Sequence, residues 1–391
     1  MKTQCSKSWT DVNIDFKNRL LRHCCKSEPY TFPETYSTDY FNNSQLIQER
    51  RRMSLDEFKH SDCQSCWRDY DAGLGAYRDW MNRWEDSKFD RVLPNTPHTN
   101  YIDIELDNTC DLSCIYCSSI CSSKIAVEEG VVNVDNTRQY DIDKFKLWLA
   151  NIAAYSTEET VINFLGGEPT ASKLFYDLLE YIEVLTKRYP YFKLRIEICT
   201  NCNSKKHLMD KIIAAIDNSN VEWAVSISNE SMGATAELIR YGLDWERFRE
   251  NLIRYIKHPK VTYITFAPTV NAFSLKTFAN YISWVHSIMA THARQKSFGW
   301  VGSHVTWPAA LDIKYLPDYY KQYIIDAQGQ LDLDRNTRQL SNYDRFSKFL
   351  NEMENRIGSE YRENYREYLK DFVSQKNKVK QTYKLDALLD E

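Results

Sequence analysis

From residue 101 onward the chain alternates between short apolar, β-rich runs and longer runs whose apolar residues recur at helical spacing. Such alternation is typical of βα units, in which crossover helices join parallel strands. The short runs predict strands at residues 101–108, 160–167, 193–201, 222–228, 261–270 and 297–305. The longer runs predict helices at residues 141–155, 173–189, 205–216, 245–256 and 275–290, with Asp141 placed to cap the first of them.

Six consecutive units predict an α/β fold in the form of an incomplete (β/α)6 barrel, because repeated right-handed crossovers curl a parallel sheet. Functional residues on parallel sheets follow the carboxyl ends of the strands. The segments directly after each predicted strand are therefore the places to look for chemistry.

The two ends of the chain follow different patterns. Residues 9–15 and 19–25 flank a Lys17-Asn18 turn and predict a hairpin, with a helix near residues 41–53. After Pro317 the chain is polar with helical spacing. One helix face is interpreted as core packing, with a substrate platform as the alternative: Tyr361, Tyr365, Tyr368 and Phe372. The expected domains are a small N-terminal cysteine-rich hairpin/helix domain (1–95), the partial barrel (96–310) and a helical C-terminal extension (311–391).

Composition narrows the class of protein. No segment approaches the roughly 18 apolar residues of a membrane span and the N-terminus lacks the layout of a secretory signal, so a cytoplasmic protein with no membrane partner is expected. The net charge of -4 does not indicate a nucleic-acid partner. Because cytosolic thiols are kept reduced, the 11 cysteines favour metal ligation over disulfides.

Cys110, Cys114 and Cys117 follow the first predicted barrel strand at C-x3-C-x2-C spacing. Three thiolates can hold three irons of a [4Fe–4S] cluster and leave the fourth iron open to a small molecule. Two alternatives are a structural zinc site and a closed ferredoxin-type cluster with Cys121 as the fourth ligand. We interpret Cys121 as a bystander.

This segment, including Tyr116 before the last cysteine, resembles the fingerprint of the radical S-adenosylmethionine (radical SAM) superfamily. The resemblance implies that Cys110, Cys114 and Cys117 ligate a [4Fe–4S] cluster whose open iron binds S-adenosylmethionine (SAM). Electron transfer then cleaves SAM, and the 5′-deoxyadenosyl radical takes hydrogen from a substrate. Tyr116 would lie near the adenine.

Two later strand ends also resemble motifs of this family. Gly166-Gly167-Glu168 follows the second strand and is similar to the GGE motif, whose backbone meets the SAM amino group. Thr200-Asn201 ends the third strand and resembles a Thr-Asn-Gly motif, with Cys202 in the glycine position. Cys199 and Cys202 have C-x2-C spacing but are interpreted as buried packing residues.

The fourth strand ends in Ser226-Ile-Ser228-Asn229, which resembles a Ser-x-Asp pattern that contacts the SAM ribose or carboxylate. Asn229 replaces the usual acid, so it keeps hydrogen bonding without charge. Arg240 resembles a family arginine that pairs with the methionine carboxylate. The alternative for Arg240 is a surface residue on a helix.

The N-terminal cysteines are Cys5, Cys24, Cys25, Cys63 and Cys66. Their order resembles a twitch domain, a shorter relative of the SPASM domain, placed before the barrel as in phage-encoded radical SAM proteins. The resemblance implies a second, auxiliary [4Fe–4S] cluster with one of Cys24 and Cys25 as a ligand. A structural zinc ion is the alternative, because zinc favours the same four thiolates.

The resemblance implies a radical SAM enzyme in the cytoplasm, the host's if phage-encoded, that is reduced by a protein such as flavodoxin or ferredoxin. Twitch and SPASM relatives often modify peptides or proteins, so a polypeptide is the first expected substrate and a sugar or nucleotide the alternative. No catalytic side chain is assigned beyond the cluster and the SAM site. The alternative of a different class is a non-catalytic zinc or iron–sulfur binding protein.

Overall fold

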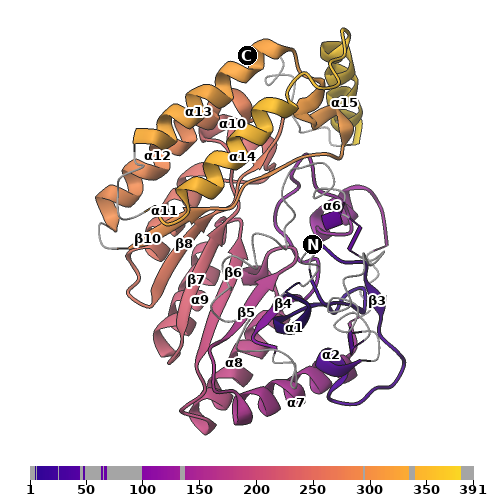
Figure 1. Cartoon of the computed structure of the whole chain (residues 1–391), viewed down its shortest axis with the longest axis vertical. Coiled ribbons are helices and arrows are strands. Elements are labelled where there is room, and N and C mark those ends of the chain that lie inside the picture. Colours follow the sequence, from indigo (N-terminus) through magenta and orange to yellow (C-terminus); the bar gives the residue numbers. More distant parts are fainter. Residues whose placement is uncertain are drawn as a thin grey trace. The chain divides into compact units, whose positions relative to one another are not determined.

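The computed structural model describes residues 5, 7–24, 26–44, 47–48, 63–64, 66–67, 99–132, 137–293, 296–333 and 340–379 (Figure 1). The chain divides into two compact units. The first unit comprises residues 1–107, 134–166 and 173–197, and the second comprises residues 108–133, 167–172 and 198–391. The domain limits at residues 95 and 310 stay predictions.

The first unit is built on a sheet with the strand order β6-β5-β4-β1-β2-β3. Its strands are β1 (Asp11–Asp15), β2 (Leu20–Arg22), β3 (Tyr30–Thr31), β4 (Tyr101–Glu105), β5 (Thr160–Leu165) and residues 194–197 of β6 (Leu194–Thr200). The predicted N-terminal hairpin is confirmed, because β1 and β2 pair antiparallel. Strand β1 also pairs parallel with β4, so the hairpin and the first predicted barrel strand share one sheet.

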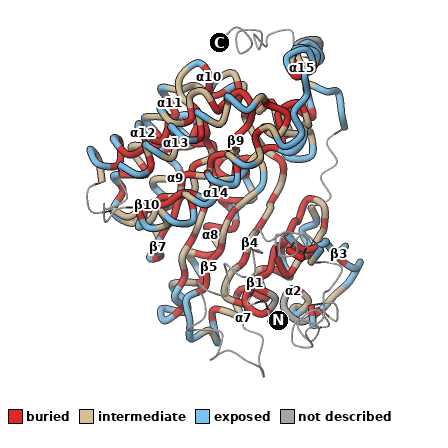
Figure 2. Tube along the Cα trace, turned by 45° about the horizontal axis from the view of Figure 1, so that its top comes forward, coloured by how far each residue is buried: buried red, intermediate tan, exposed pale blue. Residues whose placement is uncertain are grey.

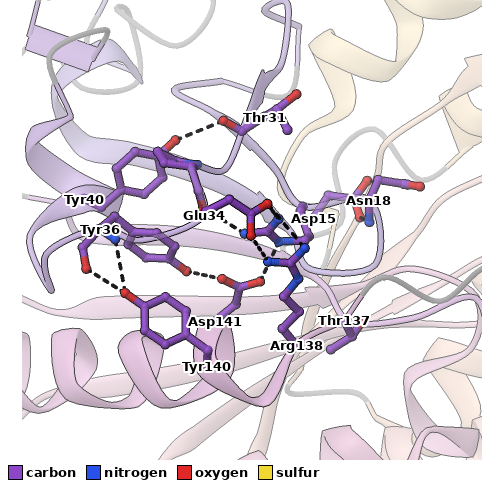
Figure 3. Close-up of polar contacts among 12 residues, drawn as sticks. Asp15, Asn18, Thr31, Glu34, Tyr36, Tyr40, Thr137, Arg138, Tyr140 and Asp141 are labelled. Atoms are coloured by element: carbon purple, nitrogen blue, oxygen red, sulfur yellow. Dashed lines mark hydrogen bonds and ion pairs between the residues drawn. The ribbon is translucent and has the colours of Figure 1, made fainter.

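Among the described residues of the first unit, the helices include α1 (Lys7–Thr10), α2 (Tyr40–Asn43), α7 (Gln139–Tyr155) and α8 (Lys173–Arg188). Asp141 joins the N-terminal segment to α7, because its buried carboxylate accepts hydrogen bonds from Arg19 Nε at 2.9 Å and from the Tyr36 hydroxyl at 2.6 Å. Figure 3 shows the bond from Tyr36. The N-cap of α7 is Arg138. The predicted capping role of Asp141 is therefore wrong, because this side chain binds the N-terminal segment instead.

The second unit continues with the order β10-β8-β7-β6. Its strands are residues 198–200 of β6, β7 (Glu222–Ile227), β8 (Val261–Phe266) and β10 (Ser297–Trp300), with a separate parallel pair of β9 (Thr269–Val270) and β11 (Ser303–His304). Strand β8 pairs parallel with both β7 and β10. The predicted run 261–270 is interrupted between β8 and β9 at Pro268, which has no N–H group to donate.

All six predicted barrel regions contain a strand, and the five predicted helices are present with ends shifted by one or two residues. The mixed α/β class with a mostly parallel sheet is thus confirmed, and the barrel form stays a prediction. The other helices are α6 (Ser123–Glu128), α9 (Lys206–Asn218), α10 (Gly233–Ile239), α11 (Trp245–Lys257), α12 (Leu275–His292), α13 (Lys321–Leu333), α14 (Tyr343–Arg356) and α15 (Tyr365–Val379). Short 3-10 helices are η2 (Pro169–Ala171), η3 (Ala309–Leu311), η4 (Ile313–Tyr315) and η5 (Asp318–Tyr320).

Helices α12, α13 and α14 lie side by side in the second unit (Figure 1) and alternate buried and exposed positions along their length (Figure 2). In the predicted aromatic stripe, Tyr365 is buried but Tyr361 precedes α15 and is exposed, so the interpretation as core packing is right for Tyr365 and wrong for Tyr361. Within the described residues, no helix combines the length and apolar character needed to cross a bilayer.

Candidate functional site

The loop between β4 and α6 carries Cys110, Cys114 and Cys117 and belongs to the second unit. Backbone hydrogen bonds fix its shape: Cys117 N donates to Cys114 O at 3.0 Å, and Ile115 N donates to the Ile239 carbonyl of α10 at 2.9 Å. All three cysteines are half-buried and none is in a disulfide.

The three thiols lie in an environment that opposes ionisation in the absence of a metal. Burial raises the pKa of Cys114 to about 11, against the opposing effect of Arg240. The pKa of Cys110 is raised by burial and then by Cys114, and that of Cys117 by a hydrogen bond with Cys121 and then by burial and Cys114. A metal reverses this preference, because it binds thiolates and releases their protons.

The donor set fits an iron–sulfur cluster in type and spacing, since soft thiol ligands in one short loop suit such clusters. Among the described residues, no group of three or more Cys, His, Asp or Glu side chains is already arranged as a metal site. Cys121 is exposed and its thiol is hydrogen-bonded to Cys117. The closed cluster with Cys121 as the fourth ligand therefore stays open as an alternative.

Glu168 joins the Gly-Gly-Glu turn to the end of β6. Its backbone N–H donates to Thr109 O at 2.7 Å, and its buried carboxylate accepts hydrogen bonds from Thr170 Oγ1 at 2.6 Å, Thr200 Oγ1 at 2.8 Å and Asn201 N at 2.6 Å. Burial, reinforced by Asp111, raises the pKa of Glu168 to about 7, although these hydrogen bonds lower it. The hydrogen bonds of the carboxylate are thus made within the protein. A ligand would therefore contact the backbone of the turn.

The two glycines of this turn are required for different reasons. Gly166 has a φ of +116°, which side chains other than glycine rarely adopt. A Cβ on Gly167 would overlap the Thr109 carbonyl oxygen and would lie 2.8 Å from the Asn108 carbonyl carbon. The second glycine is therefore needed for close packing against the backbone of the cysteine loop.

Asp111 ties the cysteine loop to the end of β6. Its two carboxylate oxygens accept from Asn201 Nδ2 and from Asn203 Nδ2, each at 2.8 Å. Between these two residues, Cys202 has a φ of +59°, a left-handed conformation that glycine adopts without strain. Cys202, which stands where the Thr-Asn-Gly motif that this segment resembles has glycine, thus keeps a glycine-like backbone conformation. Sequence reasoning missed Asp111 and Asn203, because a lone Asp in a loop carries no pattern.

Arg240 is buried at the C-terminal end of α10, so its interpretation as a surface arginine is wrong. It donates to Glu230 Oε2 from Nη2 at 2.6 Å and from Nε at 3.1 Å, and its guanidinium carbon lies 5.6 Å from the Tyr116 ring centroid. The Tyr116 hydroxyl donates to Glu230 Oε1 at 3.1 Å. Glu230, which sequence reasoning missed, follows Asn229 directly and supplies an acid next to the position where the family pattern has one.

The ends of β6 and β7 are joined by a bond from Ser228 N to Thr200 O at 2.9 Å. Ser228 Oγ lies 3.3 Å from Cys199 Sγ, which is also hydrogen-bonded to Ser226. Asn229 is buried and donates to Ser231 O at 2.6 Å. Cys202 is buried, as predicted, whereas Cys199 is half-buried.

The N-terminal cysteines lie in the first unit. Cys24 and Cys66 are buried, Cys5 and Cys63 are half-buried, and Cys25 lies outside the described residues. Cys63 Sγ is 3.8 Å from Nε2 of His23, a residue that sequence reasoning did not single out. The assignment of these cysteines to an auxiliary cluster stays a prediction.

No family model matches the chain, and no curated protein matches it. Among solved structures, hexahistidine-tagged anSMEcpe with bound AdoMet is similar with a TM-score of 0.42 and 17% identity, over 62% of this chain and 64% of that chain. Streptococcus suis SuiB bound to S-adenosylmethionine is similar with a TM-score of 0.41 and 16% identity, over 86% of this chain and 72% of that chain. This chain thus spans slightly less than two thirds of anSMEcpe.

Proposed function

We propose that this chain is a radical SAM enzyme that acts on a peptide or protein. One observation carries the proposal: the segments that resemble the family motifs form one hydrogen-bonded group in the second unit. Asp111 links the cysteine loop to Asn201, Glu168 links the Gly-Gly-Glu turn to Thr200, and Ser228 links β7 to β6. A structural zinc site needs only the cysteines and gives no reason for the other motifs to meet.

In this proposal Cys110, Cys114 and Cys117 hold a [4Fe–4S] cluster. With SAM bound, the cluster would pass one electron from an external reductant to SAM. This would break the S–C5′ bond and release methionine and the 5′-deoxyadenosyl radical, which would take a hydrogen atom from the substrate. The half-buried loop limits the access of water to the cluster. Tyr116 lies against Arg240 and would hold the adenine.

The polar residues of the site would bind SAM. Gly166, Gly167 and Glu168 offer backbone groups to the amino group, and Arg240 offers its guanidinium to the carboxylate. Glu230 already pairs with Arg240. The SAM carboxylate would therefore share Arg240 with Glu230 or displace Glu230 from it. Ser226, Ser228 and Asn229 would contact the ribose or carboxylate. Thr200 and Asn201 would complete the SAM site.

The test is reconstitution without oxygen, followed by measurement of iron, sulfide and 5′-deoxyadenosine after addition of SAM and a strong reductant. Cys114→Ala is expected to abolish SAM cleavage, whereas Cys121→Ala and Cys63→Ala are expected to retain it. Zinc in place of iron, or iron without SAM cleavage, contradicts the proposal. Loss of the cluster in Cys121→Ala would instead favour the closed ferredoxin-type cluster.

A further inference from the structure

A cavity of about 310 Å³ lies in the second unit beside the first turn of α12, η5 and the start of α15. This volume is at the lower end of the range for small-ligand pockets. Its lining combines cations and aromatic hydroxyls: Lys276, Arg362, Arg366, Tyr319, Tyr320 and Tyr361. Glu363 is the one carboxylate in the lining, so the cavity carries a positive balance.

The three cations of this cavity outnumber the one carboxylate in its lining, Glu363. Nearby, Lys314 pairs with Glu360 at 2.9 Å and Lys321 pairs with Asp318 at 2.7 Å, whereas Lys276, Arg362 and Arg366 form no ion pair within the described part of the chain. Lys276 also lies in the first turn of α12, where a cation opposes the helix dipole. Helix stability therefore does not account for this lysine.

Arg362 lies beside two tyrosine rings. Its guanidinium carbon lies 4.3 Å from the Tyr315 ring centroid and 4.9 Å from the Tyr368 ring centroid. The two rings lie at 87° to each other, so the guanidinium contacts both by cation–π interactions. A guanidinium presents paired N–H groups, which suit a carboxylate. Arg366, in the first turn of α15, is exposed and adds a second guanidinium.

Residues that line the cavity also contact elements of the candidate site. Phe273 and Leu369 line the cavity and pack in the same hydrophobic cluster as Ile115, which lies between two of the predicted cluster ligands. Thr277, another lining residue, is hydrogen-bonded to Ser231 at 2.6 Å, and the Ser231 carbonyl accepts from Asn229. A ligand in the cavity would therefore be anchored beside the elements that carry the cysteine loop and the end of β7.

We propose that this cavity binds an acidic segment of the polypeptide substrate through Lys276, Arg362 and Arg366. The proposal rests on the proposed function and deepens it, because it names the chemistry of the substrate segment. The apolar wall at Phe273 and Leu369 fits an apolar side chain next to the acidic residue.

The test uses the full reconstituted chain and two fluorescent, C-terminally amidated peptides, Gly-Glu-Phe-Glu-Gly and Gly-Gln-Phe-Gln-Gly, in anisotropy titrations. We expect the acidic peptide to bind at least about tenfold more tightly than its amide analogue, since charge-assisted hydrogen bonds are roughly twice as strong as neutral ones. Arg366→Glu and Lys276→Glu are each expected to weaken binding of the acidic peptide about tenfold. Arg345→Glu, the same charge change at an exposed position of α14, is the matched control and is expected to have no effect.

Equal affinity for the two peptides, an equal loss in Arg345→Glu, or binding of ATP in the cavity without binding of the acidic peptide would overturn the proposal. SAM cleavage without peptide is measured in the same variants and is expected to be unchanged. Absence of SAM cleavage in the unmodified chain counts against the proposed function, whereas loss of peptide discrimination with normal SAM cleavage counts against the cavity alone.

Discussion

At the scale of single residues, the candidate site depends on buried charges that the fold partly compensates. Glu168 is a buried carboxyl that accepts hydrogen bonds from the turn and from the end of β6. Arg240 and Glu230 form a buried ion pair, and the Glu230 carboxylate also accepts a hydrogen bond from the Tyr116 hydroxyl. In each arrangement the stability of the folded protein depends on the charge of one carboxyl group. Substitution of that carboxyl therefore tests the arrangement.

The stability contributed by Glu168 is expected to fall as pH rises. Its pKa is raised from 4.5 to about 7, so the folded state holds this proton more strongly than the unfolded state. The contribution is complete below the unfolded pKa and is lost as pH passes the folded one, by roughly 3 kcal/mol at about 1.4 kcal/mol per unit. Urea unfolding from pH 5 to 8 should show the free-energy difference between wild type and Glu168→Gln decreasing with pH. Parallel pH profiles for the two proteins would refute this role.

Removal of the Glu230 charge is expected to destabilise the protein by about 3 kcal/mol, because a buried Arg240 would lose its counter-charge. If Arg240 binds the SAM carboxylate, SAM should raise the Tm of Glu230→Gln more than it raises the Tm of wild type. Thermal melts with and without SAM measure both effects, and Glu129→Gln, an exposed change near α6, serves as the control. An equal Tm shift in wild type and Glu230→Gln would argue against SAM binding by Arg240.

At the scale of elements, the site is assembled from loops that follow strands, and their backbones are in close contact. Gly167 packs so closely against the cysteine loop that a Cβ there would overlap the Thr109 carbonyl oxygen. The neighbours of Gly167 are backbone atoms, which cannot move aside as a flexible side chain can. The cysteine loop and the turn after β5 are therefore expected to behave as one unit.

Gly167→Ala is expected to destabilise the protein by about 2 kcal/mol and to lower its iron content after reconstitution, because the cysteine loop must shift to admit the methyl group. Gly329→Ala is the matched control: this glycine lies in α13 with no atom within 4 Å of the added Cβ, so a gain of up to about 1 kcal/mol is expected. Urea unfolding and iron analysis check both variants. Normal iron binding by Gly167→Ala would show that the loop tolerates the shift.

At the scale of the whole molecule, the predicted ligand cysteines divide between the two compact units: the N-terminal ones belong to the first and those of the loop to the second. If both groups hold [4Fe–4S] clusters, the reconstituted chain should contain about eight iron atoms. Cys63→Ala should reduce this number to about four and leave SAM cleavage intact, whereas Cys114→Ala should also reduce it to about four but abolish cleavage. About four iron atoms plus one zinc in the unmodified chain would instead assign a structural zinc ion to the N-terminal group.

The order of strands and helices could be predicted from the sequence. The spacing of apolar residues and the β-rich composition of the short runs indicate which residues face a core. The three cysteines of the loop and the motifs after later strands were also readable, since their spacing is local. The break between β8 and β9 at Pro268 depends on one missing N–H group, which a count of apolar residues does not register.

The sequence by itself determined the α/β class, the candidate ligands and the position of each motif at a strand end. Only the tertiary structure decided that Asp141 binds Arg19 and Tyr36 instead of capping α7, and that Arg240 is buried against Glu230. It also decided that Asp111 joins the cysteine loop to β6, and that cations from α12 and α15 line one cavity. The physical reason is that these contacts join residues distant in sequence, and a side chain's partner and burial depend on how the chain packs.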